Sequence, residues 1–281
     1  MPTPPRPGAV MSSPTHALLP DGEAPLDRAT LEAFLRAMGS NMVLVGGQAL
    51  AFWMDRYGIQ PQGATVSNDG DALGRIDHAE RIARSLRAVL VRPSERARTS
   101  LVAQIRIPTG AHGRERNIDV LHLLYTVGGL RKSREFTDAV WRDSIEMEWR
   151  RGARIRVMHP LHVLDSRIQN AVGLLDDKGP HVLTQAVWAI EVARAAILRV
   201  LTQPGQDERV GAMIQQVYRL ARSRAGRQLM REHGIEALSA IPAAQIRAHS
   251  SAHERQLAAV ERTIRERAHP TNDEAPASGA S

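Results

Sequence analysis

Two short stretches, MVLVGGQAL at residues 42–50 and SNDGDAL at residues 67–73, decide the fold that we expect for this chain. In the first stretch a short apolar run ends in Gly46 and Gly47, and an amphipathic segment follows. This pattern predicts a strand, a tight turn and a helix. Glycines at such a turn let the backbone approach a ligand closely, and the N–H groups at the start of the helix favour an anion such as a phosphate.

The second stretch carries two carboxylates, Asp69 and Asp71, which point to the same face of an extended strand because they are two residues apart. A third, Asp119, lies in the strand-like run NIDVL at residues 117–121 and can stand beside them. Three clustered carboxylates are hard to keep ionised without cations, and hard divalent ions such as Mg²⁺ suit such a cluster. A phosphate turn beside carboxylates that bind metal is the arrangement used in phosphoryl or nucleotidyl transfer.

Each motif has a simpler explanation when it is taken alone. Asp69, Gly70 and Asp71 have the composition of a surface turn, and a glycine pair such as Gly46 and Gly47 often makes a tight turn without a ligand. The ordered combination of glycine pair, paired aspartates and a later strand aspartate favours the functional explanation.

This ordered combination resembles the nucleotidyltransferase superfamily related to DNA polymerase beta, and within it the AbiEii-type toxin nucleotidyltransferases and their uncharacterised bacterial relatives. Three further segments are similar to that family. They are residues 117–122 followed by GGL at residues 128–130, MHPLHVL at residues 158–164, and the run over residues 166–178. The resemblance covers roughly residues 28–200, and it implies an α/β nucleotidyltransferase-like mixed sheet flanked by helices, followed by an α-helical domain.

For the metal site, the resemblance implies that Asp69 and Asp71 bind two Mg²⁺ ions. Asp119 would be a further ligand that also helps to deprotonate the attacking hydroxyl. The sequence departs from the family at Gly70, where an aliphatic residue usually packs into the sheet. Because glycine weakens a strand interior, we expect a looser strand with the carboxylates retained.

The resemblance also implies a nucleotide site for a nucleoside triphosphate. The nucleotide-binding candidates are Gly46, Gly47, Gln48, Ser67, Arg167 and Lys178. The glycines would bind phosphates through backbone amides, whereas Ser67 can either contact the nucleotide or cap a turn. Arg167 and Lys178 match basic residues that reach the triphosphate from the helical domain in relatives. Taken alone, each is better explained as a solvated cation on a helix face.

Composition limits the class of protein. The net charge of +7 and the pI of about 10.7 favour a polyanionic partner, although only Lys132 and Lys178 are lysines and the arginine excess also fits a GC-rich genome. The absence of cysteine excludes disulfides and thiolate chemistry. No apolar run approaches the roughly 20 residues of a membrane span, and no secretion signal is recognisable, so we expect a soluble cytoplasmic protein without a membrane partner.

The pattern along the chain predicts four regions. We expect a disordered segment over residues 1–26, a catalytic domain over 27–157, an α-helical domain over 158–268 and a disordered tail over 269–281. The expected helices of the catalytic domain are residues 27–38 and 78–89 and one after Gly47. The expected strands are residues 42–45, 67–73, 101–107 and 118–124.

The function that follows from the resemblance is Mg²⁺-dependent transfer of a nucleoside monophosphate to a hydroxyl of a tRNA end or a protein. The protein would be the toxin of a toxin–antitoxin or abortive-infection system with a cognate antitoxin. Two alternatives stay open. The acceptor can be a small molecule such as an aminoglycoside, or the chain can be a non-catalytic binding protein that lost activity through changes such as Gly70.

Overall fold

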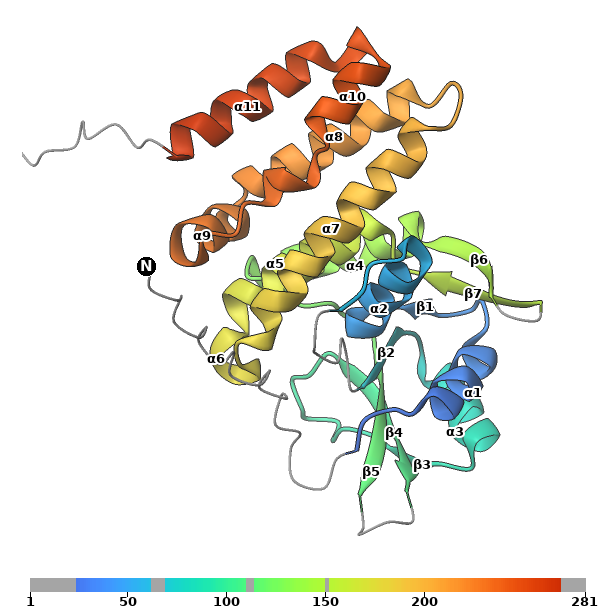
Figure 1. The fold of residues 1–281 in the computed structure, drawn as a ribbon. Helices are drawn as coiled ribbons and strands as arrows, with labels where there is room; N and C mark the ends of the chain where they lie inside the picture. The colour runs from blue at the N-terminus through green and yellow to red at the C-terminus, as the bar shows by residue number, and fades with distance from the viewer. Residues whose placement is uncertain (1–23, 62–68, 110–113, 150–151, 269–281) are drawn as a thin grey trace, which may run out of the picture.

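The strand that carries Asp71 lies in the middle of a seven-stranded mixed sheet (Figure 1). The computed structural model describes residues 24–61, 69–109, 114–149 and 152–268. Within these residues the strands are β1 (Val43–Leu44), β2 (Gly70–Leu73), β3 (Val89–Val91), β4 (Leu101–Pro108), β5 (Glu115–Leu121), β6 (Ile145–Trp149) and β7 (Ala153–Val157). Their order across the sheet is β3-β4-β5-β2-β1-β7-β6. The predicted α/β class with a mixed sheet is therefore confirmed.

The parallel pairs of the sheet are β2 with β5 and β1 with β7, and the other neighbours are antiparallel. The helices of this half are α1 (Arg28–Met38), α2 (Gly46–Tyr57), α3 (Ile76–Leu86) and α4 (Gly129–Asp143). Asp27 caps α1, where its carboxylate accepts from the N–H of Thr30 at 2.7 Å, and Gly39 ends the helix with a positive φ of 58°. The helix expected over residues 27–38 is therefore confirmed, with Asp27 as its N-cap and not its first residue.

Several elements differ from the prediction. Val89, expected at the end of a helix, lies in the edge strand β3, because α3 already ends at Leu86 and Arg87 follows in the left-handed conformation. Strand β5 begins and ends three residues before its expected limits. Strands β6 and β7 and helix α4 were not predicted. The alternation of apolar and polar residues in IEMEW, residues 145–149, is the signal that indicates β6.

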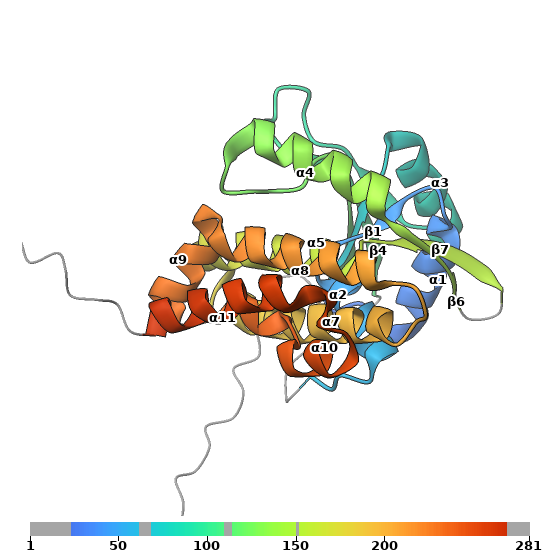
Figure 2. The same cartoon turned by 90° about the horizontal axis from the view of Figure 1, so that it is seen from above.

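The second half of the chain is helical, as predicted. Its helices are α5 (Pro160–Gly173), α6 (Leu175–Lys178), α7 (His181–Leu201), α8 (Asp207–Arg222), α9 (Arg224–His233), η1 (Ala237–Ala240), α10 (Ala243–His249), η2 (Ser251–His253) and α11 (Glu254–Ala268). Helices α5 and α7 pack against α2, and α8 and α11 form a further layer beyond α7 (Figures 1 and 2). The buried apolar side chains of the sheet and of these helices form one cluster. The two regions expected as separate domains thus share a core.

Helix α7 also bears on the question of membranes. It has 21 residues, and by length and composition it is apolar enough to cross a bilayer, contrary to the expectation that no apolar run approaches a membrane span. More than half of that stretch is buried against the rest of the protein, including α5 and α2. The helix therefore occupies a core position.

The described chain begins inside the segment expected to be disordered. The N–H of Ala24 donates to the carbonyl of Glu115 at 2.9 Å, and the Nε of Arg116 donates to the carbonyl of Pro25 at 3.2 Å. Leu26 packs against the hydrophobic core. Residues 24–26 therefore belong to the folded unit, whereas residues 1–23 and the expected tail 269–281 lie outside the described residues.

Candidate functional site

Strands β2 and β5 bring Asp71 and Asp119 together. In the parallel pairing of these strands, Asp71 lies directly opposite Asp119. Because neighbouring strands are about 4.8 Å apart and paired residues of parallel strands point to the same face, the two carboxylates stand side by side on one face of the sheet. The predicted juxtaposition of these two aspartates is confirmed.

Asp69 contributes differently from this pair. It precedes β2, and its charge further raises the pKa of the Asp71 carboxyl. Within the described part of the chain, however, no three His, Asp or Glu side chains stand close enough together to hold a metal ion. The structure thus assembles a carboxylate pair, with Asp69 near enough to act on it electrostatically.

Gly46 places the start of α2 against the Asp71 side chain. Its φ is +65°, and a Cβ at this position would overlap with Oδ2 of Asp71. The N–H of Val45 donates to the carbonyl of Asp71 at 3.0 Å, which ties the turn to β2. No side chain caps the start of α2, which includes the buried Gly47. The predicted strand, glycine turn and helix are confirmed, and the N-terminal amides of α2 lie beside a carboxylate.

Gly70 does not loosen β2 in the way that we expected. The position where its Cβ would lie is 3.1–3.3 Å from side-chain atoms of Ile118, Leu26 and Phe34. These side chains fill the space that an aliphatic residue would occupy. Since successive strand residues face opposite sides, this packing is on the face away from Asp71. The glycine is therefore accommodated without disturbing the carboxylate.

The electrostatics of the pair are unfavourable in the absence of a cation. Burial first, and then the charge of Asp119, raise the pKa of the Asp71 carboxyl to about 7. Burial also raises the pKa of Asp119, although a hydrogen bond from Nε2 of Gln104 to its Oδ1 at 3.1 Å opposes the shift. Positive charge close to both oxygens would lower both pKa values and keep the pair ionised.

Arg167, on α5, supplies part of that positive charge. Its side chain is only 7% exposed, so the alternative of a solvated cation is wrong for this residue. Nη1 donates to Oε1 of Gln185 at 2.9 Å and Nη2 donates to Oγ of Ser166 at 3.1 Å, whereas the buried Nε has no partner among the described residues. Burial lowers the pKa of Arg167, and the charge of Asp71 opposes that shift. Arg167 therefore acts on the carboxylate pair as a buried positive charge.

Lys178 lies at the end of α6 and is exposed to solvent. This agrees with the explanation that it is a solvated cation on a helix face. Its charge nevertheless lowers the pKa of both Asp71 and Asp119. The two basic candidates from the helical half therefore both act on the carboxylate pair. One does so from a buried position and the other from the surface.

One nucleotide-binding candidate does not join this group, and another lies outside the described residues. Gln48 is buried and lines a different cavity, formed with residues of α1, α2 and β6 such as Arg28, Leu35 and Trp149, and none of the three aspartates borders that cavity. The Gln48 side chain points into this cavity because successive residues of a helix project in different directions, and position 48, one residue after Gly47, faces away from β2. Ser67 lies outside the described residues.

Sequence reasoning missed Gln104 and Arg106 of β4. Gln104 is the antiparallel partner of Asp119, and Nε of Arg106 donates to Oε1 of Gln104 at 2.7 Å. Both are polar positions in the alternating run LVAQIRI, residues 101–107, so that strand pattern marks them as one face. Only the pairing of β4 with β5 shows that this face is the one that carries Asp119.

No protein-family model matches this chain, and no curated protein has a significantly similar sequence. The residues of the site are therefore the basis on which its function is inferred.

Proposed function

We propose that this chain transfers a nucleoside monophosphate from a nucleoside triphosphate to a hydroxyl acceptor. The observation that carries the proposal is the half-buried pair Asp71 and Asp119, directly opposite each other on parallel strands, at the uncapped start of α2. Arg167 and Lys178 add positive charge beside this pair. Carboxylates, helix-terminal amides and basic side chains together are what a triphosphate and its metal ion require.

The donor set fits Mg²⁺. In sites of this kind the ion is usually held by one or two carboxylates, with water and substrate phosphates as the other ligands, so Asp71 and Asp119 suffice for one ion. A second ion would use Asp69 as well. When bound, Mg²⁺ would neutralise charge on the carboxylates and on the phosphates of the substrate.

In the proposed reaction the acceptor oxygen attacks the α-phosphorus and forms a new P–O bond. The bond from the α-phosphorus to the bridging oxygen of the β-phosphate breaks, and pyrophosphate leaves with the electron pair of that bond. Asp119, whose carboxylate would lie beside the acceptor hydroxyl, takes the hydroxyl proton as the general base. The amides of Gly46 and Gly47 and the guanidinium of Arg167 hold the phosphates in place.

The acceptor that we propose is a tRNA end or a protein hydroxyl, in the cytoplasm, with the chain acting as a toxin that a cognate antitoxin restrains. The net charge of +7 supports an acidic acceptor such as RNA. The alternative of a non-catalytic protein was based on Gly70, and the packing of Leu26, Phe34 and Ile118 beside that residue gives it no support.

Label transfer tests this proposal. The purified protein is incubated with Mg²⁺, each of the four α-³²P-labelled nucleotides, and either total RNA or cell lysate. We expect label on RNA or on a protein, and a loss of at least about a hundredfold in the Asp71→Asn variant because one ligand of the metal is removed. The matched control is Asp138→Asn, which changes an exposed aspartate of α4 and should keep the wild-type rate.

Two results would count against the proposal. Label that persists unchanged in Asp71→Asn would separate the activity from this site. The absence of label under every condition, together with the absence of Mg²⁺-dependent nucleotide binding, would favour a non-catalytic role.

A further inference from the structure

A second site lies in the helical layer, in a pocket of about 470 Å³ between α8, α9 and α11. Its lining residues are Tyr218, Arg222, Arg227, Arg262, Thr263, Glu266 and Arg267, and we call it the arginine pocket. None of the residues of the carboxylate site borders it.

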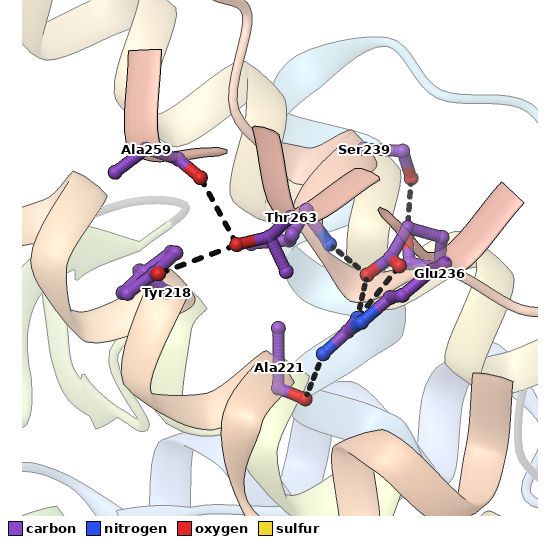
Figure 3. Close-up of polar contacts among 8 residues, drawn as sticks. Tyr218, Ala221, Glu236, Ser239, Ala259 and Thr263 are labelled. Carbon is purple, nitrogen blue, oxygen red and sulfur yellow. Dashed lines mark hydrogen bonds and ion pairs between the residues drawn. The ribbon is translucent and has the colours of Figure 1, made fainter. Parts of the chain in front are cut away.

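One arginine of the pocket is part of the framework. Nη1 of Arg267 binds both carboxylate oxygens of Glu236, at 2.9 and 2.7 Å, and Nη2 donates to the carbonyl of Ala221 at 3.0 Å. Both side chains are largely shielded from solvent. Glu236 also precedes η1 and accepts from the N–H of Leu238, so this ion pair joins three segments of the chain (Figure 3). The wall of the pocket is therefore held in place, and the charge of Arg267 is already matched.

The other three arginines have little or no negative charge beside them. Within the described part of the chain, neither Arg222 nor Arg227 has a carboxylate oxygen within 4.0 Å, and Arg262 has only the exposed Glu266 at 3.9 Å. Three guanidinium groups thus face one carboxylate. Two positive charges are left unmatched at one concave surface.

Local structure accounts for only part of this arrangement. A cation at the end of a helix is favoured by the helix dipole, which explains Arg222 in the last turn of α8. It does not explain Arg227, which lies in the first half of α9, where the dipole disfavours a cation. Arg227 instead donates to the carbonyl of Arg222 at 2.8 Å, a contact that holds the two guanidinium-bearing segments together.

The remaining walls of the pocket are polar and preorganised. The hydroxyls of Tyr218 and Thr263 are 3.3 Å apart, and Thr263 donates to the carbonyl of Ala259 at 3.0 Å (Figure 3). The hydrogen bond with Thr263, and next the nearby Arg222, lower the pKa of the Tyr218 phenol. Nη1 of Arg222 lies 3.3 Å from the Tyr218 oxygen, and its guanidinium carbon is 5.5 Å from the centre of that ring.

We propose that the arginine pocket binds a phosphate monoester. Guanidinium groups bind phosphate oxygens in pairs of parallel hydrogen bonds, which makes arginine the residue most suited to this ligand. A phosphate monoester carries a charge of about −1.5 to −2 at neutral pH, which matches the two unpaired positive charges. Tyr218 also borders a neighbouring pocket with Ile214 and Ala259, which leaves room for the organic part of the ester. The site is independent of the proposed transfer at the aspartates.

Calorimetry with adenosine 5′-monophosphate tests the proposal. The titration is done at low salt with EDTA present, so that the carboxylate pair repels the anion. The Arg222→Gln/Arg227→Gln variant should bind at least about tenfold more weakly, because two charged donors are lost. The matched control is Arg209→Gln/Arg219→Gln, which removes the same charge from exposed positions of α8 outside the pocket and should stay within about threefold of wild type. Adenosine, which lacks the phosphate, should not bind.

The binding results distinguish the arginine pocket from other places in the protein where the nucleotide can bind. Equal losses in both double variants, binding of adenosine as tight as that of the monophosphate, or no binding to the wild type would each overturn the proposal. Asp71→Asn should leave the affinity unchanged, so failure of nucleotidyl transfer and failure of this pocket are distinguishable. A 5′-phosphorylated RNA octamer that binds tighter than its 5′-hydroxyl form would identify an RNA end as the ester, and equal binding of the two would identify a free nucleotide.

Discussion

The carboxylate site of the sheet and the arginine pocket of the helical layer carry opposite charge imbalances. At the first, the half-buried Asp71 and Asp119 stand together, and their pKa values are lowered by the charges of Arg167 and Lys178 at Asp71 and of Lys178 and Arg106 at Asp119. At the second, three exposed guanidinium groups surround one carboxylate at the surface. The carboxylate site is therefore suited to bind a cation, and the arginine pocket is suited to bind an anion.

The difference between the two regions is the cost of their unmatched charge. Burial removes water from the Asp71 carboxyl and raises its pKa to about 7, so the protein is less stable when that site is charged. Arginines 222 and 227 remain hydrated, and their mutual repulsion is screened by water and salt. The imbalance at the carboxylate site is therefore the stronger indication of function, because Arg167 and Lys178 offset only part of its cost and the pKa of Asp71 stays raised.

The largest effect is expected from Gly46→Ala, which places a methyl group on Oδ2 of Asp71. We expect a loss of unfolding free energy of about 2–3 kcal/mol and a loss of transfer of at least about a hundredfold, because strain at positive φ and overlap add together. The control is Gly129→Ala, where φ is +80° but no atom lies within 4 Å of the added Cβ. It should cost only about 1 kcal/mol and leave transfer unchanged. Chemical denaturation measures the free energy of unfolding, and label transfer measures the activity. Equal effects at the two glycines would contradict the close approach of Gly46 to the Asp71 side chain.

A smaller effect separates the buried cation of the carboxylate site from the exposed one. We expect Arg167→Gln to weaken Mg²⁺–nucleotide binding about thirtyfold, because a desolvated charge interacts strongly, and Lys178→Gln to weaken it about threefold. Only the Lys178 contribution should fade on raising the salt concentration. Calorimetry measures the affinities. The Arg167→Lys variant tests whether nucleotide binding needs the planar guanidinium group or only its positive charge. A larger effect at Lys178 than at Arg167 would contradict the difference drawn between buried and exposed charge.

The smallest effect concerns stability and its dependence on pH. The folded pKa of Asp71, about 7, lies above its usual 3.8, so the folded state binds more protons and stability falls as pH rises from about 4 through 7. Without metal, Asp71→Asn should therefore be more stable than wild type by about 1–2 kcal/mol at pH 8 and equal to it near pH 4. Arg222→Gln, at the exposed imbalance, should stay within about 0.5 kcal/mol at both pH values. Thermal unfolding across this pH range measures the differences in stability. If Asp71→Asn were more stable than wild type by the same amount at every pH, the ionisation of Asp71 would not be the cause.

Several strands and helices of the first half of the chain could be predicted from local signals. The apolar run before Gly46, the N-cap Asp27 and the stop at Gly39 each act within a few residues, and the structure has the corresponding elements. The hairpin of β6 and β7 was missed although β6 alternates, because its signal is one short edge strand next to a long helix. Short elements that depend on neighbours are the ones that sequence patterns identify least well.

Two expectations about side chains depended on contacts that the sequence does not contain. Gly70 was expected to weaken its strand, but Leu26, 44 residues earlier in the chain, packs into the space beside it. Gln48 was expected to face the nucleotide, but the rotation of α2 directs it into the cavity beside α1. In both cases the decisive neighbours come from another element.

The sequence by itself determined which segments form strands and helices, where the glycine turn lies, and that Asp71 and Asp119 are strand residues, because these properties follow from local backbone preferences and from side-chain periodicity. Only the tertiary structure decided that the two aspartates pair in register, that Arg167 is buried beside them, and that arginines of three helices share one pocket. These are properties of neighbours in space. Burial, charge matching and pKa depend on such neighbours, whatever their distance along the chain.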